Sequence, residues 1–341
     1  MAPPVYINPV IRFYIVQKEK FAIISPTLFC NNACVFCSSD YRSASKKSHA
    51  PLDRLLVQTD ALVEESHPGR IIISGGEPTL YPDIFKYIAH LRKKLLRVTL
   101  FTNGRTLKDK SLLVRFMEAG VSQFHIPMHS AYPAIHDKIA RADGAHQETV
   151  TALTNISEAR KSNPDIALTV VSVVHSANIS KVMEASQFLS GFKPNHILLA
   201  NCIVETQAPP SHRDHLVHLD QIRSEIPKTV LWGKERGQKI YAENIPPCAL
   251  PGAEKACLDY FKVRDIEVSG FLLESSSSEA RLTKYQQLSK SGHKSHTAKC
   301  QKCTFRNICN GVFTTYLERF GDAGIEPVSY ASIKHRLGQR K

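Results

Sequence analysis

Runs of β-branched and other apolar residues alternate with amphipathic stretches over the first two thirds of the chain. Six runs have the composition of strands: 21–27, 70–74, 97–102, 123–128, 167–174 and 196–200. Five stretches between them carry apolar residues at helical spacing: 52–65, 84–94, 108–119, 147–162 and 179–189. Strands that alternate with helices predict a parallel sheet joined by right-handed crossovers. The expected fold class is therefore α/β.

Three cysteines directly follow the first of these strands, in the spacing Cys30-x3-Cys34-x2-Cys37. Three thiolates on one short loop can hold three irons of a 4Fe-4S cluster and leave the fourth iron without a protein ligand. Such an iron is open to a substrate or cofactor. A zinc site or buried free thiols are the alternatives, although zinc sites usually pair two ligands on each of two loops.

A second loop with a distinctive composition follows the second predicted strand. It reads Ser74-Gly75-Gly76-Glu77-Pro78, and paired glycines let a ligand approach the backbone closely. The carboxyl ends of parallel strands meet at one edge of a sheet, so this loop is expected beside the cysteine triad. Alone, the Gly-Gly-Glu-Pro sequence would most often be a turn.

Taken together, the two motifs resemble the radical S-adenosylmethionine superfamily, and the resemblance covers residues 21–204. It implies a partial (β/α)6 TIM-type barrel with its active site at the carboxyl ends of the strands. It also implies that the cluster binds S-adenosylmethionine, and that one electron cleaves this cofactor to a 5'-deoxyadenosyl radical that abstracts a substrate hydrogen. An electron donor such as flavodoxin or ferredoxin is an implied partner.

The resemblance also implies which residues contact the cofactor. Phe36 would lie near the adenine, the segment 75–77 would meet the methionine amino group, and Arg141 would pair with the carboxylate. A solvated charge at a helix end is an equal alternative for Arg141, whereas a plain turn is the lesser alternative for residues 102–104. The implied cofactor-binding residues are Phe36, Ser74, Gly75, Gly76, Glu77, Thr102, Asn103, Ser130 and Arg141.

A second group of cysteines lies near the C-terminus, in the spacing Cys300-x2-Cys303-x5-Cys309. Half of a zinc ribbon is one interpretation. The spacing is also similar to the SPASM and Twitch modules of radical S-adenosylmethionine enzymes, which implies a second, auxiliary 4Fe-4S cluster. The fourth ligand would be Cys248, with Cys257 as the second choice.

The alternation of strands and helices stops near residues 206–212, a proline-rich stretch that predicts a domain boundary. We expect the partial barrel at residues 1–205 and a smaller, cysteine-rich α+β module at residues 206–341. Within this module the pattern predicts a helix at 215–226 and strands at 229–233 and 239–245.

Cys202 stands alone, just after the sixth predicted strand. A lone cysteine is most often a small buried hydrophobic residue. The mouth of the barrel is nevertheless a position from which a thiol can donate a hydrogen atom to a substrate radical. Cys202 is therefore the candidate catalytic residue.

The chain has 44 Lys and Arg residues against 31 Asp and Glu, a net charge of +13, which favours anionic partners. Bound clusters with their cysteinates would offset part of this excess. The nine cysteines and a start without an export signal predict the reducing cytoplasm. No run approaches the roughly 18 apolar residues of a membrane span, so no membrane partner is expected.

The leading hypothesis is a radical S-adenosylmethionine enzyme acting on a small anionic molecule such as a sugar or nucleotide. The outcome would be epimerisation, dehydrogenation, bond formation or rearrangement. Modification of a ribosomally made peptide is a second enzymatic hypothesis. A zinc-containing nucleic-acid-binding protein is an alternative from another class, and salt-dependent binding would support it.

Overall fold

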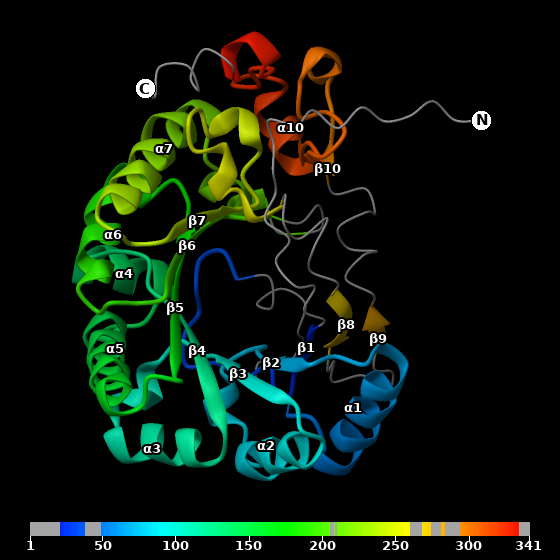
Figure 1. The fold of residues 1–341 in the computed structure, drawn as a ribbon, viewed down its shortest axis with the longest axis vertical. Coiled ribbons are helices and arrows are strands. Elements are labelled where there is room, and N and C mark those ends of the chain that lie inside the picture. The colour runs from blue at the N-terminus through cyan, green and yellow to red at the C-terminus, as the bar shows by residue number, and fades with distance from the viewer. Residues whose placement is uncertain are drawn as a thin grey trace.

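The computed structural model describes residues 21–37, 49–204, 208, 210–259, 268–273, 281–283 and 294–333. Its centre is a curved sheet in which seven strands lie side by side in chain order, each parallel to the next. Figure 1 shows this sheet as an open arch with helices on its outer side. The strands are β1 (Phe21–Ser25), β2 (Arg70–Ile73), β3 (Arg97–Phe101), β4 (Val121–Pro127), β5 (Ala167–Val174), β6 (His196–Asn201) and β7 (Ile240–Glu243).

The helices that cover the sheet follow the predicted alternation. The five helices predicted between the barrel strands are confirmed, with ends that differ by at most three residues. The helix predicted at 215–226 is the longer α7, and a short helix that was not predicted, α4, precedes α5. Local signals explain several starts. The Asp109 carboxylate accepts from the backbone at the start of α3, and Pro133 opens α4. The helices are α1 (Leu52–Ser66), α2 (Ile84–Lys93), α3 (Lys110–Glu118), α4 (Pro133–Ala140), α5 (Ala145–Ser162), α6 (Val182–Ser190) and α7 (Leu219–Glu235).

The partial barrel is confirmed, with more strands than the six expected in it, because the strand predicted at 239–245 in the C-terminal module is β7 and joins this sheet. β7 extends the sheet beyond β6, and β8 (Val268–Leu273) pairs parallel with β1 on the other side. β9 (Arg281–Thr283) then pairs antiparallel with β8, so the described strands end in two separate edges. The predicted boundary at residue 205 lies outside the described residues, whereas β7 and β8 both come from the chain beyond it.

One predicted strand is wrong. Residues 229–233 belong to α7, which continues through Pro227 to Glu235. The helix buries Ile226, Thr229, Val230 and Gly233, which recur at the three- to four-residue spacing of a helix face. Packing of this face against the sheet outweighs the strand propensity of its β-branched residues.

The C-terminal part is a small α+β unit at the carboxyl end of the sheet. It contains a two-stranded antiparallel sheet, β10 (Lys294–Ser295) with β11 (Val312–Phe313), followed by α10 (Thr314–Phe320). Thr315 Oγ1 donates to Val204 O at 2.9 Å, and the Tyr316 hydroxyl accepts from Leu219 N at 3.2 Å. These bonds fasten α10 to the chain that follows β6 and to the start of α7. None of the helices in the described residues is long and apolar enough to cross a membrane.

Candidate active site

The carboxyl ends of six neighbouring strands bring the predicted motifs to one edge of the sheet. This placement follows from the parallel pairing and confirms the expected neighbourhood of the loops. The residues that follow β1 to β6 in turn are Cys30, Gly75, Asn103, Ser130, His175 and Cys202.

The thiols of Cys30, Cys34 and Cys37 are free and half-buried. Burial is the main cause that raises the pKa of Cys30 to about 11 and that of Cys34 to about 12, and the neighbouring thiols of the triad contribute to both values. Three soft donors therefore gather on one loop. Within the described residues no three Cys, His, Asp or Glu side chains are placed to hold a single metal ion. Ligands of a 4Fe-4S cluster lie further apart than those of one ion, because irons and sulfides fill the space between them.

The end of α4 supports the cysteine loop. The N–H groups of Ala33 and Val35 donate to the carbonyls of Ala140 and Ile139, each at 2.9 Å. A helix leaves its last carbonyls without partners inside the helix, so they are available to a neighbouring loop. Arg141 ends this helix in the left-handed conformation, with φ of 48°.

The two glycines after β2 allow a close approach to the same loop. A Cβ on Gly76 would lie 2.3 Å from Phe29 O, closer than any side chain could occupy, and Gly75 has φ of 117°. The N–H of Gly76 donates to Thr27 O at 2.8 Å, and that of Glu77 to Phe29 O at 2.6 Å. The glycine loop is thus paired with the residues that lead into Cys30.

The Glu77 carboxylate is fully buried and is bonded inside the protein. Its Oε1 accepts from Thr102 Oγ1 at 2.6 Å and from Thr79, and its Oε2 accepts from Asn103 N at 2.7 Å. Burial raises the pKa of Glu77, and these hydrogen bonds act in the opposite direction. Glu77 and Thr102, both predicted to contact the cofactor, thus use their side chains to join the loops after β2 and β3. Ser74, the residue before the glycines, continues the pairing with β1 by donating its N–H to Ile24 O at 2.9 Å.

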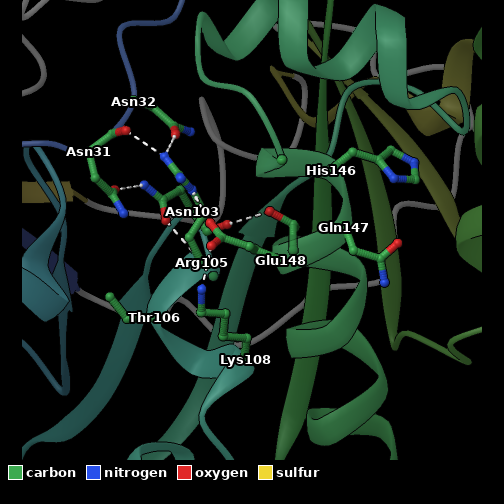
Figure 2. A network of polar contacts seen from close by, with 12 residues as sticks. Asn31, Asn32, Asn103, Arg105, Thr106, Lys108, His146, Gln147 and Glu148 are labelled. Carbon is green, nitrogen blue, oxygen red and sulfur yellow. Dashed lines mark hydrogen bonds and ion pairs between the residues drawn. The ribbon is translucent and has the colours of Figure 1, made fainter.

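Asn103 points its side chain at the cysteine loop, as Figure 2 shows. Its Nδ2 donates to Asn31 Oδ1 at 2.7 Å and lies 3.8 Å from Cys30 Sγ. Its Oδ1 accepts from Arg105 N at 3.0 Å, which fixes the direction of the amide. The expected place of Asn103 beside the triad thus agrees with the geometry.

Phe36 packs between two buried histidines that follow β4 and β5. Its ring centroid is 5.1 Å from that of His129 and 5.7 Å from that of His175. Burial lowers the pKa of His175 to about 4 and that of His129 well below its usual value, so both rings are neutral. His175 Nδ1 accepts from Ala177 N at 3.3 Å, and its buried Nε2 has no hydrogen-bond partner among the residues that the structure describes.

Ser130, Arg141 and Cys202, which were also predicted as site residues, differ in their exposure to solvent and in their contacts. Ser130 is 1% exposed, and its Oγ accepts from Tyr132 N at 3.0 Å in the turn before α4. Arg141 is exposed, and its charge is one of the causes, after burial, that lower the pKa of His215. Cys202 is 1% exposed and packs in a small apolar cluster with Phe36. Burial raises its pKa to about 12, so it is a protonated thiol at neutral pH.

The second cysteine group gathers around one cavity of the C-terminal part. Burial, and after it the nearby thiols of Cys309 and Cys303, raise the pKa of Cys248 to about 12. Cys257 lines the adjoining cavity instead, and its thiol donates to Ile245 O at 3.2 Å. The cysteines that line the first cavity are Cys248, Cys300, Cys303 and Cys309.

Sequence comparison matches residues 24–189 to the radical SAM superfamily. A probable GTP 3',8-cyclase of Thermococcus kodakarensis is 25% identical over 222 residues, which are 62% of this chain and 67% of that protein. An AdoMet-dependent heme synthase of Methanosarcina barkeri is 30% identical over 164 residues, 48% of this chain and 46% of its own. The matches thus span two thirds or less of these relatives.

Two solved structures share the fold at low sequence identity. SuiB of Streptococcus suis bound to S-adenosylmethionine superposes with a TM-score of 0.62 at 13% identity, over 89% of this chain and 75% of that chain. The protein anSMEcpe with bound AdoMet also gives 0.62, at 15% identity over 94% of this chain and 92% of its own.

The residues present fit the two groups that this superfamily implies, a 4Fe-4S cluster and S-adenosylmethionine. The triad supplies three soft, half-buried thiols on one loop. The buried Nε2 of His175 has no partner in the described chain and lies beside Phe36, where a ligand atom can pair with it. The chain thus carries a radical S-adenosylmethionine domain over residues 24–189.

Proposed function

We propose that this enzyme removes a hydrogen atom from a small anionic substrate, such as a sugar, a nucleotide or another metabolite. Cys30, Cys34 and Cys37 would hold the 4Fe-4S cluster, with an electron donor of the flavodoxin or ferredoxin class. The cluster and S-adenosylmethionine supply, when bound, the 5'-deoxyadenosyl radical chemistry of the superfamily. The tasks of the protein are to hold both groups, orient the substrate and exclude water.

The observation that carries the proposal is the fastening of the cysteine loop to two neighbouring strand ends and to the end of one helix. The loop after β2 pairs with its start through Gly76 and Glu77, and Asn103 after β3 reaches Cys30. The carbonyls that end α4 hold Ala33 and Val35. A loop that is bonded on three sides keeps its thiols in fixed positions, which supports a role as a rigid cluster site.

The interior beside the triad suits a reaction that must exclude water. Phe36, His129, His175 and Cys202 are packed together, and both histidines are neutral. Apolar and neutral walls offer few groups that would retain water. In the proposal Phe36 lies against the adenine, and Asn103 contacts the bound cofactor.

The charge distribution supports an anionic substrate. His212, Arg141 and Arg319 all lower the pKa of His215, after the larger effect of burial, so these three basic groups lie near His215, and Arg319 also pairs with Asp214. This basic group adds to a net charge of +13. One curated relative is described as a probable GTP 3',8-cyclase, and GTP is a polyanion.

We assign the second cysteine group to an auxiliary 4Fe-4S cluster. Cys248 is the fourth ligand in this proposal, because it shares a cavity with Cys300, Cys303 and Cys309, whereas Cys257 bonds to a backbone carbonyl. The unit lies at the carboxyl end of the sheet, where α10 is bonded to Val204 and Leu219. A cluster there is suited to take up or deliver an electron during the reaction.

Cys202 keeps its proposed role as hydrogen donor to a substrate radical. Its raised pKa preserves the S–H group, which is the form that donates a hydrogen atom. In a Cys202→Ala variant we expect cofactor cleavage to continue while formation of the reduced product stops. Undiminished product formation would exclude the role.

Deuterium transfer tests the proposed reaction. The anaerobically reconstituted, reduced chain is incubated with S-adenosylmethionine and deuterated sugar phosphates, nucleotides or nucleoside triphosphates, and 5'-deoxyadenosine is analysed by mass spectrometry. We expect deuterium in 5'-deoxyadenosine with one anionic class, and none in the Cys30→Ala variant. Transfer from a neutral compound or a peptide alone would overturn the proposed substrate class.

A further inference from the structure

Three of the four cysteines proposed to hold the auxiliary cluster belong to one short loop, residues 300–309. Within this loop the N–H of Cys303 donates to Cys300 O at 3.0 Å. Cys248 reaches the same cavity from a different segment, the short 3-10 helix η5 (Pro247–Ala249). The place of Cys248 relative to the other three thiols therefore depends on the contacts that fasten η5 to the rest of the fold.

Arg223, on the helix α7, bonds directly to the backbone of Cys248. Its Nε donates to Cys248 O at 3.4 Å, and its Nη2 donates to Gly324 O. Its Nη1 lies 2.6 Å from Asp220 Oδ1, one turn earlier in α7, and 3.2 Å from Glu326 Oε1. The side chain is 17% exposed, so these contacts are largely shielded from water.

The two carbonyls that Arg223 binds belong to segments that both border the cluster cavity. Cys248 lines the cavity from one segment, and Ile325, the neighbour of Gly324, lines it from the other. A guanidinium presents its donors in a rigid, planar fork, so it holds several acceptors at fixed relative positions. The helix that carries it is itself anchored, because Ile222 is fully buried in the core. Arg223 thus ties both segments to the barrel.

We propose that Arg223 is a positioning residue that keeps Cys248 in place as the fourth ligand of the auxiliary cluster. The inference rests on the proposed function, because it requires a cluster in this cavity. Contacts that orient a ligand determine how well a metal site holds its metal. Without the guanidinium, η5 loses its bond to α7, and the iron that Cys248 would bind is left with sulfide ligands alone. Such an iron is lost on mild oxidation.

Iron analysis and electron paramagnetic resonance test this inference. The parent is the full chain with only the auxiliary cluster, because three residues are changed to alanine: Cys30, Cys34 and Cys37. It is reconstituted anaerobically, oxidised briefly with ferricyanide and desalted. We expect about four irons per chain in the parent and about three, with the signal of a three-iron cluster, in Arg223→Met. Cys248→Ala should behave alike, and the double variant should lose no more iron, because both changes remove the same ligand.

The three-iron signal separates positioning from a structural role, since a general loss of stability would release the whole cluster. Glu326→Gln is the matched control, because it removes an acidic partner of Arg223 and leaves the bond to Cys248 O. It should keep about four irons. Arg223→Lys keeps the charge, but its single nitrogen cannot bond to Cys248 and Gly324 together. It should therefore lose iron as Arg223→Met does, and it tests the inference even if Arg223→Met does not fold.

The inference and the proposed function fail in different ways. Full iron without a three-iron signal in the Arg223 variants, the same iron loss in Glu326→Gln, or a further loss in the double variant would overturn the inference alone. A parent chain that binds no iron, or Cys248→Ala with full iron, would overturn the proposed ligands of the auxiliary cluster as well.

Discussion

Individual residues at this site are fixed by how closely neighbouring loops approach one another. Gly76 lies where the backbone of Leu28 and Phe29 leaves no room for a Cβ. Glu77 is buried with a full set of donors, and Thr102 supplies one of them. Such contacts join segments that are far apart in the sequence, so single substitutions here affect the cluster loop directly.

Gly76→Ala is expected to lower the free energy of unfolding by about 3 kcal/mol, because the added Cβ overlaps the cysteine loop. The variant should also retain less iron after anaerobic reconstitution. Gly237→Ala is the control, since its Cβ meets nothing within 4 Å and only the left-handed backbone, about 1 kcal/mol, opposes it. Equal losses in a denaturant titration, with full iron in both variants, would contradict the close approach.

Thr102→Val removes the hydroxyl that donates to Glu77 Oε1 at 2.6 Å. We expect the free energy of unfolding to fall by about 1–3 kcal/mol, because a buried carboxylate loses a partner. Thr151→Val removes a hydroxyl bonded to Gln147 O on an exposed helix face and should change stability by less than about 0.5 kcal/mol. Chemical denaturation distinguishes the two, and a neutral Thr102→Val would refute the role of Thr102 in holding Glu77.

The sequence predicted the place of the site residues better than their contacts. Cys30, Gly76 and Asn103 could be placed at one edge because strand order determines where each loop begins. Motif spacing could not indicate that Glu77 and Thr102 bond to each other, since that depends on the packing of two loops. Arg223 was missed for the same reason, because its partners Cys248 and Gly324 lie 25 and 101 positions away.

At the scale of elements, the end of α4 combines two features. It holds a residue with a strained backbone, and its last carbonyls support the cysteine loop. Arg141 adopts a φ of 48°, and the carbonyls just before it hold the cysteine loop. Glycine would relieve the backbone strain at this position. It would also remove the guanidinium that the family resemblance pairs with the cofactor carboxylate.

Arg141→Gly is therefore expected to raise the free energy of unfolding by about 1 kcal/mol while weakening S-adenosylmethionine binding about tenfold. Lys193, with φ of 50°, offers the matched change: Lys193→Gly should give the same stabilisation and wild-type affinity. Isothermal titration of the reconstituted chain measures the affinity. If Arg141→Gly binds S-adenosylmethionine as tightly as the wild type, the Arg141 guanidinium is a solvated charge and does not bind the cofactor.

A helix or strand could be predicted where the local sequence pattern favoured the same structure as the packing of the folded chain. The five long helices have clear apolar faces, and their positions followed from the sequence alone. Residues 229–233 look like a strand locally but complete the buried face of α7. β7 and β8 enter the sheet from beyond the predicted boundary, a pairing between distant segments that no local pattern signals.

At the scale of the whole molecule, two cysteine groups lie toward the same end of one sheet. The account predicts about eight irons per reconstituted chain, four in each cluster. Cys248→Ala should reduce this to about four to seven by weakening the auxiliary cluster, whereas Cys257→Ala should keep the wild-type count. Iron analysis with Mössbauer spectra checks both. The opposite pattern would make Cys257 the fourth ligand.

Reductive cleavage of S-adenosylmethionine tests the central claim most directly. The chain is reconstituted with iron and sulfide, reduced with dithionite and assayed for 5'-deoxyadenosine and methionine, beside a variant in which Cys30, Cys34 and Cys37 are all alanine. We predict that the wild-type chain forms both products in equal amounts and that the triple variant, with its auxiliary cluster intact, forms neither. Cleavage by the triple variant, or no cleavage by a wild-type chain with full iron content, would contradict the account.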